Sequence, residues 1–127
     1  MSMQFQIDEE TLCVRLVCHG RYSQKAMLSL FDEALEIAAK KGRKAALVDV
    51  SDLRGTPPGV LERFELGVSF AEIQKSKAKI IAMVIVGEEP MIDRQRFGEI
   101  VATNRGAIAK VFTDHDQAVA WLESKVK

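Results

Sequence analysis

The feature that most constrains this chain is a short apolar run over residues 45–50, interrupted only by Asp49. Runs of this length and character are typical of parallel strands that helices cover on both faces of a sheet. A helical pattern precedes the run and stops at Gly42, and a proline-rich segment follows it. The sequence therefore predicts an α/β protein with this strand in its core.

The rest of the chain predicts a hairpin followed by alternating helices and strands. Turn and capping residues separate these elements. Ser23, for example, precedes the first helix, and Asp114 precedes the last. This ββαβαβαβα order predicts one domain over residues 1–127, a mixed sheet flanked by helices. The expected strands are 5–7, 12–18, 45–50, 79–86 and 109–112, and the expected helices are 24–41, 57–75, 92–103 and a last one after 114.

Charge and hydropathy exclude several classes of partner. The chain has 18 Lys and Arg against 18 Asp and Glu, and no window collects a run of like charge, so nucleic acid and anionic membranes are not expected partners. The longest apolar stretch, 80–86, is far shorter than the roughly 20 residues that span a bilayer. The first residues lack the pattern of a secretory signal, so we expect no membrane span and a cytoplasmic location.

Catalytic and metal-binding patterns are missing. His19 and His115 have no motif around them, and nucleophilic catalysis needs a base beside the nucleophile. Cys13 and Cys18 fall on opposite faces of one expected strand, which predicts buried free thiols and argues against a shared metal site. We therefore expect no enzyme, no catalytic residue, no metal and no cofactor, and a binding or regulatory role instead.

Asp49 is the polar exception within the apolar strand. A carboxylate near the end of a buried strand must find hydrogen-bond donors, and the backbone of the 51–56 loop or the Thr56 hydroxyl could supply them. We expect Asp49 to pin this loop, and a functional role is the alternative.

The second expected helix carries two apolar stripes instead of one. One helix does not normally bury two stripes against one sheet. An adjacent helix or loop covers the second stripe, or that stripe is a contact surface for a second copy, a partner or a lipid. The first stripe consists of Val60, Leu61, Phe64, Val68 and Ala71, and the second of Leu66, Phe70 and Ile73.

Several short segments, in this order and spacing, resemble one family. They are DVSDLRG at 49–55, RFELG at 63–67, NRG at 104–106, and VFTD at 111–114 followed by Ala118 and Trp121-Leu122. Together they resemble the STAS domains, the anti-sigma-factor-antagonist fold, and within them the SpoIIAA-like branch, which is also similar to CRAL-TRIO lipid-transfer domains. The resemblance covers nearly the whole chain and implies the STAS fold.

The resemblance also implies where a regulatory switch would lie. In STAS switch proteins a serine at the start of the second helix is phosphorylated by a partner kinase and controls docking. The matching stretch here is TPPG at 56–59, which has no serine, so the switch does not carry over. Thr56 is the only hydroxyl near that position, and a phosphate there would face a helix N-terminus.

These patterns lead to two hypotheses about function. The first is a non-enzymatic regulatory or protein-interaction module that binds a protein partner, or a second copy, through the 51–59 loop and the second helix, with Leu66 and Phe70 as anchors. The alternative is a carrier of a small apolar ligand or lipid, of CRAL-TRIO type, beneath that helix. The candidate binding residues are Asp49, Ser51, Arg54, Thr56, Gly59, Arg63, Leu66, Phe70 and Ile73.

Overall fold

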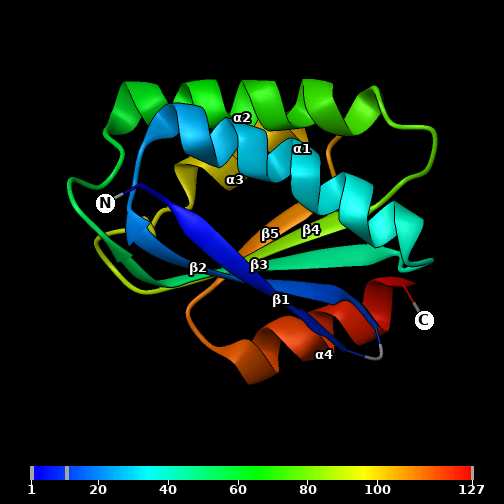
Figure 1. The fold of residues 1–127 in the computed structure, drawn as a ribbon. Helices are drawn as coiled ribbons and strands as arrows, with labels where there is room; N and C mark the ends of the chain where they lie inside the picture. Colours follow the sequence, from blue (N-terminus) through cyan, green and yellow to red (C-terminus); the bar gives the residue numbers. More distant parts are fainter. Residues whose placement is uncertain (1, 11, 127) are drawn as a thin grey trace.

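A computed structural model describes residues 2–10 and 12–126 and contains a five-stranded sheet in the order β1-β2-β3-β4-β5 (Figure 1). The first two strands form an antiparallel hairpin, and β2 through β5 are parallel. The mixed sheet and its ββαβαβαβα order confirm the predicted fold class. The strands are β1 (Gln4–Glu9), β2 (Val14–Arg21), β3 (Ala45–Arg54), β4 (Ala82–Val86) and β5 (Ala109–Phe112).

Helices cover both faces of the sheet. In Figure 1, α1, α2 and α3 lie on one face and α4 on the other. None of these helices, over the described ranges, has the length and apolar character needed to cross a bilayer. They are α1 (Gln24–Lys40), α2 (Val60–Lys75), α3 (Phe97–Asn104) and α4 (His115–Val126).

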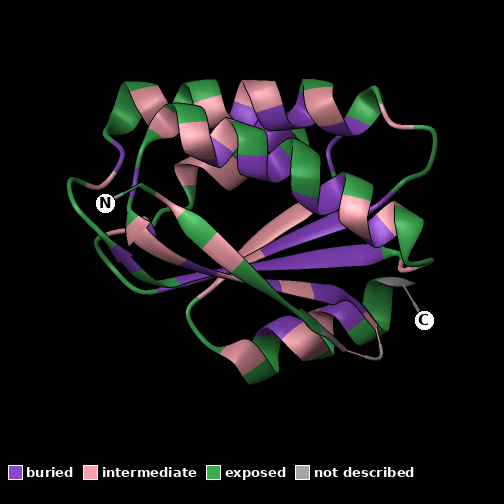
Figure 2. Ribbon diagram, viewed as in Figure 1, coloured by how far each residue is buried: buried purple, intermediate pink, exposed green. Residues whose placement is uncertain are grey.

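The strand β3 is the centre of the core, as predicted. Ala46 and Val48 belong to the larger apolar cluster beneath α1, whereas Ala45 and Leu47 belong to the cluster against α4. Alternation of side chains along a strand produces this division. Figure 2 shows β3 and β4 buried along most of their length.

The predicted start and stop of α1 are confirmed. The Ser23 hydroxyl accepts a hydrogen bond from the Ala26 N–H at 3.2 Å, which satisfies a donor that the first turn leaves unpaired. Gly42 follows the helix with a φ of 70°, a left-handed conformation that glycine adopts without steric cost.

The predicted end of β3 is wrong, because residues 51–54 continue the strand instead of opening a loop. The expected break at His19 and Gly20 does not occur, and this part of β2 stays paired with the extension of β3. A register shift between Val17 and His19 places one extra residue in β3 at this point. Pairing across the sheet thus outweighs the local tendency of glycine to end a strand.

Three other predicted boundaries are also displaced. Helix α2 begins at Val60 with Gly59 as its N-cap. Pro57 and Pro58 therefore precede the helix, whereas the predicted helix over 57–75 placed them in its first turn. Strand β4 begins at Ala82 instead of 79, and α3 begins at Phe97 instead of 92. The Asp93 carboxylate accepts hydrogen bonds from the backbone of Gln95 and Phe97, which holds the segment before α3 as a turn.

The two stripes of α2 are explained by its neighbours. Helix α2 lies between α1 and α3, and most of its contacts are with these helices. On the α1 side, the Phe70 ring meets Phe31 edge-on with centroids 5.4 Å apart. On the α3 side, a Cβ on Gly67 would lie 2.6 Å from the Gly98 carbonyl oxygen, so only glycine permits the observed approach.

The expectation that Phe70 is an exposed anchor is therefore wrong. Phe70 is 4% exposed, and Leu66 and Ile73 are half-buried against the same core. The exposed apolar residues of α2 come from the other stripe. Val60 is 74% and Leu61 is 69% exposed, because the eight-residue α3 meets α2 near Gly67 and leaves its first turn uncovered.

The difference between the stripes predicts different responses to truncation. We expect Phe70→Ala to lower the free energy of unfolding by about 3–5 kcal/mol, because it removes a buried ring from between two helices. Leu61→Ala, the matched control on the exposed stripe, should change it by less than about 0.5 kcal/mol. Urea denaturation measures both, and equal effects would contradict the assignment of the buried stripe.

Candidate functional site

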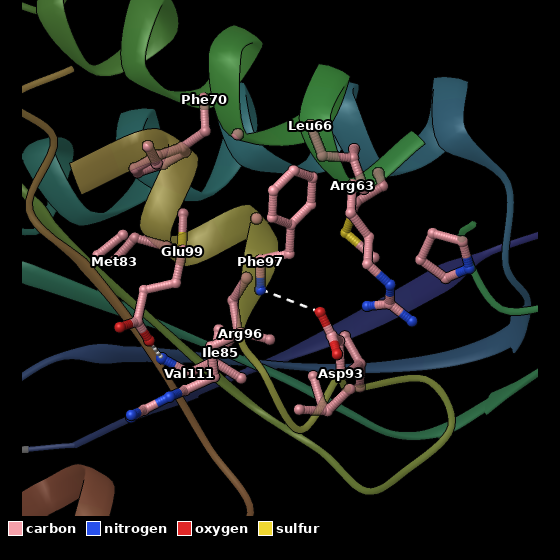
Figure 3. Close-up of a pocket in the computed structure, with 18 of the residues that line it drawn as sticks. Arg63, Leu66, Phe70, Met83, Ile85, Asp93, Arg96, Phe97, Glu99 and Val111 are labelled. Atoms are coloured by element: carbon pink, nitrogen blue, oxygen red, sulfur yellow. Dashed lines mark hydrogen bonds between the residues drawn. The ribbon is translucent and has the colours of Figure 1, made fainter. Parts of the chain in front are cut away.

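A small apolar cavity lies beneath α2. Because α2 rests mainly on α1 and α3, a space remains between it and the strands. Phe70 and Leu66 line this space from α2, and Met83 and Ile85 line it from β4 (Figure 3). The volume of this α2 cavity is about 110 Å³.

Charged side chains gather at one end of the α2 cavity. Arg63, Asp93 and Arg96 all line it, and Arg96 is exposed to solvent, so the cavity opens at this end. Arg63 donates from Nη1 to the Met91 carbonyl at 3.3 Å and from Nη2 to the Pro90 carbonyl at 3.0 Å. Figure 3 shows the Arg63 guanidinium reaching from α2 toward Asp93.

Asp93 organises this end of the cavity. Its carboxylate accepts from the Phe97 N–H at 3.0 Å and from the Gln95 N–H at 3.1 Å. The hydrogen bond from Phe97 is the main cause that lowers the pKa of Asp93, and the charge of Arg63 acts in the same direction. Through these two hydrogen bonds the Asp93 carboxylate stabilises the turn that leads into α3.

Glu99 ties α3 to the edge strand β5. One carboxylate oxygen accepts from the Val111 N–H at 2.8 Å, and the other lies 4.0 Å from the Lys110 ammonium. Strand β5 is at the edge of the sheet, where backbone donors lack a neighbouring strand. Glu99 therefore supplies one of the acceptors that a further strand would provide, and it also lines the α2 cavity.

Asp49 lies on the opposite face of the sheet from the α2 cavity. Its carboxylate accepts from Arg15 Nη2 at 2.8 Å and from the Ser51 N–H at 3.0 Å, next to the register shift of β3. Burial alone would raise the pKa of Asp49, but the hydrogen bonds from Ser51 and Arg15 outweigh burial and hold this pKa below its ordinary value. Asp49 binds the backbone of Ser51, as predicted, but its Arg15 partner was not anticipated.

The structure thus separates the predicted site residues into three groups. Asp49 belongs to the α4 face, and Ser51, Arg54, Thr56 and Gly59 are exposed along the end of β3 and the loop that follows. The remaining predicted residues belong to α2. Of these, Arg63, Leu66 and Phe70 line the α2 cavity, and Ile73 packs against the main core.

Sequence reasoning missed the residues at the open end of the cavity other than Arg63. Asp93, Arg96 and Phe97 were expected inside or beside a helix that began at 92, whereas they form the turn before α3 and its first residue. One signal could have located them. Aspartate a few residues before an apolar helical pattern is a common helix-starting residue, and Asp93 stands four residues before Phe97.

The cysteines are buried on opposite faces of the sheet, as predicted. Cys13 belongs to the cluster against α4 and Cys18 to the larger cluster, and both are free thiols. Burial raises the pKa of each to about 12, so they stay protonated and unreactive. Within residues 2–10 and 12–126, no group of three or more His, Cys, Asp and Glu side chains is placed to hold a metal ion.

Comparison with known proteins identifies the fold. No protein-family model and no curated protein matches the sequence. An anti-sigma factor antagonist from Mycobacterium paratuberculosis matches this structure with a TM-score of 0.61 at 12% sequence identity, over 96% of this chain and 95% of that chain. The chain has the fold of an anti-sigma factor antagonist.

This match confirms the fold that the STAS resemblance predicted, the anti-sigma-factor-antagonist fold, and nothing beyond the fold. An uncharacterised protein with a SpoIIAA-like fold from Shewanella loihica also matches, with a TM-score of 0.49 at 18% identity, over 94% of this chain and 93% of that chain. In this anti-sigma-factor-antagonist fold, α2 and the loop before it contain most of the residues that the sequence singled out. At 12% identity the likeness transfers no residue role.

The Asp49 pair predicts a specific pH dependence. Because the pKa of Asp49 is lower in the folded state, its ionised form stabilises the fold above the ordinary value of 3.8, and this contribution is lost as the pH falls through the folded pKa. We expect Asp49→Asn to be less stable than wild type by about 1–3 kcal/mol at neutral pH. The gap should shrink below about pH 4.

Urea denaturation across a pH series measures this gap. Asp52→Asn is the matched control, because Asp52 is an exposed carboxylate on the same strand. A gap between wild type and Asp49→Asn that stays constant down to acidic pH would show that ionisation of Asp49 does not stabilise the fold.

Proposed function

We propose that this protein is a non-enzymatic regulatory module that binds a protein partner through the exposed start of α2 and the loop before it. The observation that carries the proposal is the exposure of three apolar side chains on one stripe of α2. Val60 and Leu61 are mostly exposed and Phe64 is 39% exposed. We call these three residues, together with residues 54–59 at the end of β3 and in the loop that follows, the α2 surface.

The composition of the α2 surface supports a protein partner. Its three apolar side chains lie in the first two turns of one helix, and clustered exposed apolar residues mark interaction sites more often than scattered ones do. The exposed Arg54 lies at the edge of the loop, and the Arg105 guanidinium lies 5.5 Å from the centre of the Phe64 ring. Apolar residues with arginine beside them are typical of interface centres.

The proposal replaces the anchors expected from the sequence. Phe70 and Leu66 point into the protein, so Leu61 and Val60 take their place as contact residues. Thr56 is exposed in the loop of the α2 surface. A phosphate on Thr56 would add negative charge two residues along the chain from Arg54, so phosphorylation would change the charge of the α2 surface.

The lining of the α2 cavity supports a non-enzymatic role. Among the described residues that line it there is no histidine, cysteine or serine, which are the usual components of a nucleophile and its base. Its two carboxylates, Asp93 and Glu99, are engaged by backbone N–H groups. Each therefore stabilises structure in the position that it occupies.

A site-specific photo-crosslinker tests the α2 surface. We expect a benzophenone side chain at Phe64 to capture a defined protein or a second copy in the native host cell, because this position faces the proposed partner. Leu61→Asp should reduce the yield of that adduct by about tenfold, since a charge at an interface centre disrupts docking. Mass spectrometry identifies and quantifies the adduct.

Ile80 provides the matched control. It is 75% exposed, apolar and outside the α2 surface, so a crosslinker there should not give the same adduct. Adducts of equal yield from both positions, or an adduct that Leu61→Asp leaves unchanged, would contradict the proposed surface.

Binding of a small apolar ligand beneath α2 is the second candidate function. The α2 cavity favours it, because an apolar space in a folded core is where such ligands bind. A cavity of about 150 Å³ binds benzene, so a cavity of 110 Å³ is too small for a long acyl chain. The size of this cavity therefore favours a small ligand over the lipid that the CRAL-TRIO similarity implies.

A further inference from the structure

We propose that the α2 cavity binds a small apolar carboxylate, with the hydrocarbon part beneath α2 and the carboxylate at Arg96. The inference rests on the second candidate function and goes beyond it by naming the chemical class of the ligand. Three features support it: the size of the cavity, the distribution of charge at its open end, and the backbone at Arg96.

The size of the cavity sets the size of the hydrocarbon part. By comparison with a cavity of about 150 Å³ that binds benzene, a volume of 110 Å³ takes about four or five carbon atoms. Phe70, Met83 and Ile85 line it and offer only apolar atoms from their side chains. A compact, branched hydrocarbon group fits this space better than an extended chain does.

The charges at the open end favour an anion. The carboxylates of Asp93 and Glu99 both accept hydrogen bonds from backbone N–H groups. The Arg63 guanidinium donates hydrogen bonds to two backbone carbonyls, those of Pro90 and Met91. The Arg96 guanidinium, in contrast, has no hydrogen-bond or ion-pair partner among residues 2–10 and 12–126, and only the Arg96 backbone is hydrogen-bonded, to Asp93 and Ile100. At the open end two cationic side chains, Arg63 and Arg96, stand against one carboxylate, Asp93, so this end carries an excess of positive charge.

The backbone at Arg96 is fixed in an unusual conformation. Its φ of 55° and ψ of 44° are left-handed, which is sterically unfavourable for arginine. The hydrogen bonds from Gln95 and Phe97 to Asp93 enclose this residue and sustain the strain. Strained residues that the surrounding structure holds in place are concentrated at ligand-binding sites, and this one lies at the opening of a cavity.

A matched pair of probes tests the ligand class. Isovalerate and its uncharged amide, isovaleramide, have the same four-carbon hydrocarbon part and differ in charge. In an NMR titration of the full chain, we expect both to perturb the resonances of Met83, Ile85 and Phe97. The acid should bind about tenfold more tightly than the amide, because both can accept a hydrogen bond from Arg96 but only the carboxylate also forms an ion pair with it.

Variants at two arginines test whether Arg96 causes the preference for the acid over the amide. Arg96→Gln should remove the preference for the acid and leave the affinity for isovaleramide unchanged, whereas Arg96→Lys, which retains the charge, should preserve part of it. Arg94→Gln is the control, because its side chain is 80% exposed, pairs with Glu89 and does not line the cavity. Ala102→Leu, which places a larger side chain in the cavity, should abolish binding of both probes.

The outcomes separate the inference from the function on which it rests. If neither probe perturbs the cavity resonances, both the inference and small-ligand binding beneath α2 are wrong. If the amide binds as tightly as the acid, or if Arg96→Gln keeps the preference for the acid, the cavity binds small ligands but the carboxylate assignment is wrong.

Discussion

The position of α2, between α1 and α3 and raised from the strands, is the constraint on which the rest of the structure depends. The close backbone approach at Gly67 and Gly98 brings α2 against α3, and the contact between Phe70 and Phe31 brings it against α1. Because these contacts hold α2 from its sides, a small apolar cavity remains below it and an apolar first turn remains exposed. Both candidate functions follow from this single arrangement.

One face of the sheet contains a stabilising ion pair, and the other contains both candidate sites. The α4 face contains the Arg15 and Asp49 pair, which satisfies a buried carboxylate and the Ser51 N–H beside the register shift of β3. The opposite face contains the α2 cavity and the α2 surface. Asp49 therefore stabilises β3, the strand that leads into the 55–59 loop, without taking part in either candidate site.

The α2 surface and the α2 cavity are close in the chain, because α2 contributes to both. Leu61 and Phe64 face outward while Arg63 and Leu66 line the cavity from the same turns. A ligand that changed the packing of Arg63 or Leu66 would therefore act on the helix that presents the exposed stripe. Because one helix contributes to both sites, binding of a ligand in the α2 cavity can be coupled to docking of a partner at the α2 surface.

The sequence by itself determined the fold class, the order of elements and the burial of residues 45–50, because these depend on periodicity and on local signals such as Ser23 and Gly42. Only the tertiary structure decided which apolar residues of α2 are buried, since both stripes consist of apolar side chains and their burial depends on where α1 and α3 lie. The same holds for Asp49 and Arg96. Asp49 lies on the face of β3 that is turned away from α2, and its partner Arg15 comes from another strand. The turn that Asp93 holds brings Arg96 to the cavity. Both placements depend on which elements pack against which face, so the local sequence does not give them.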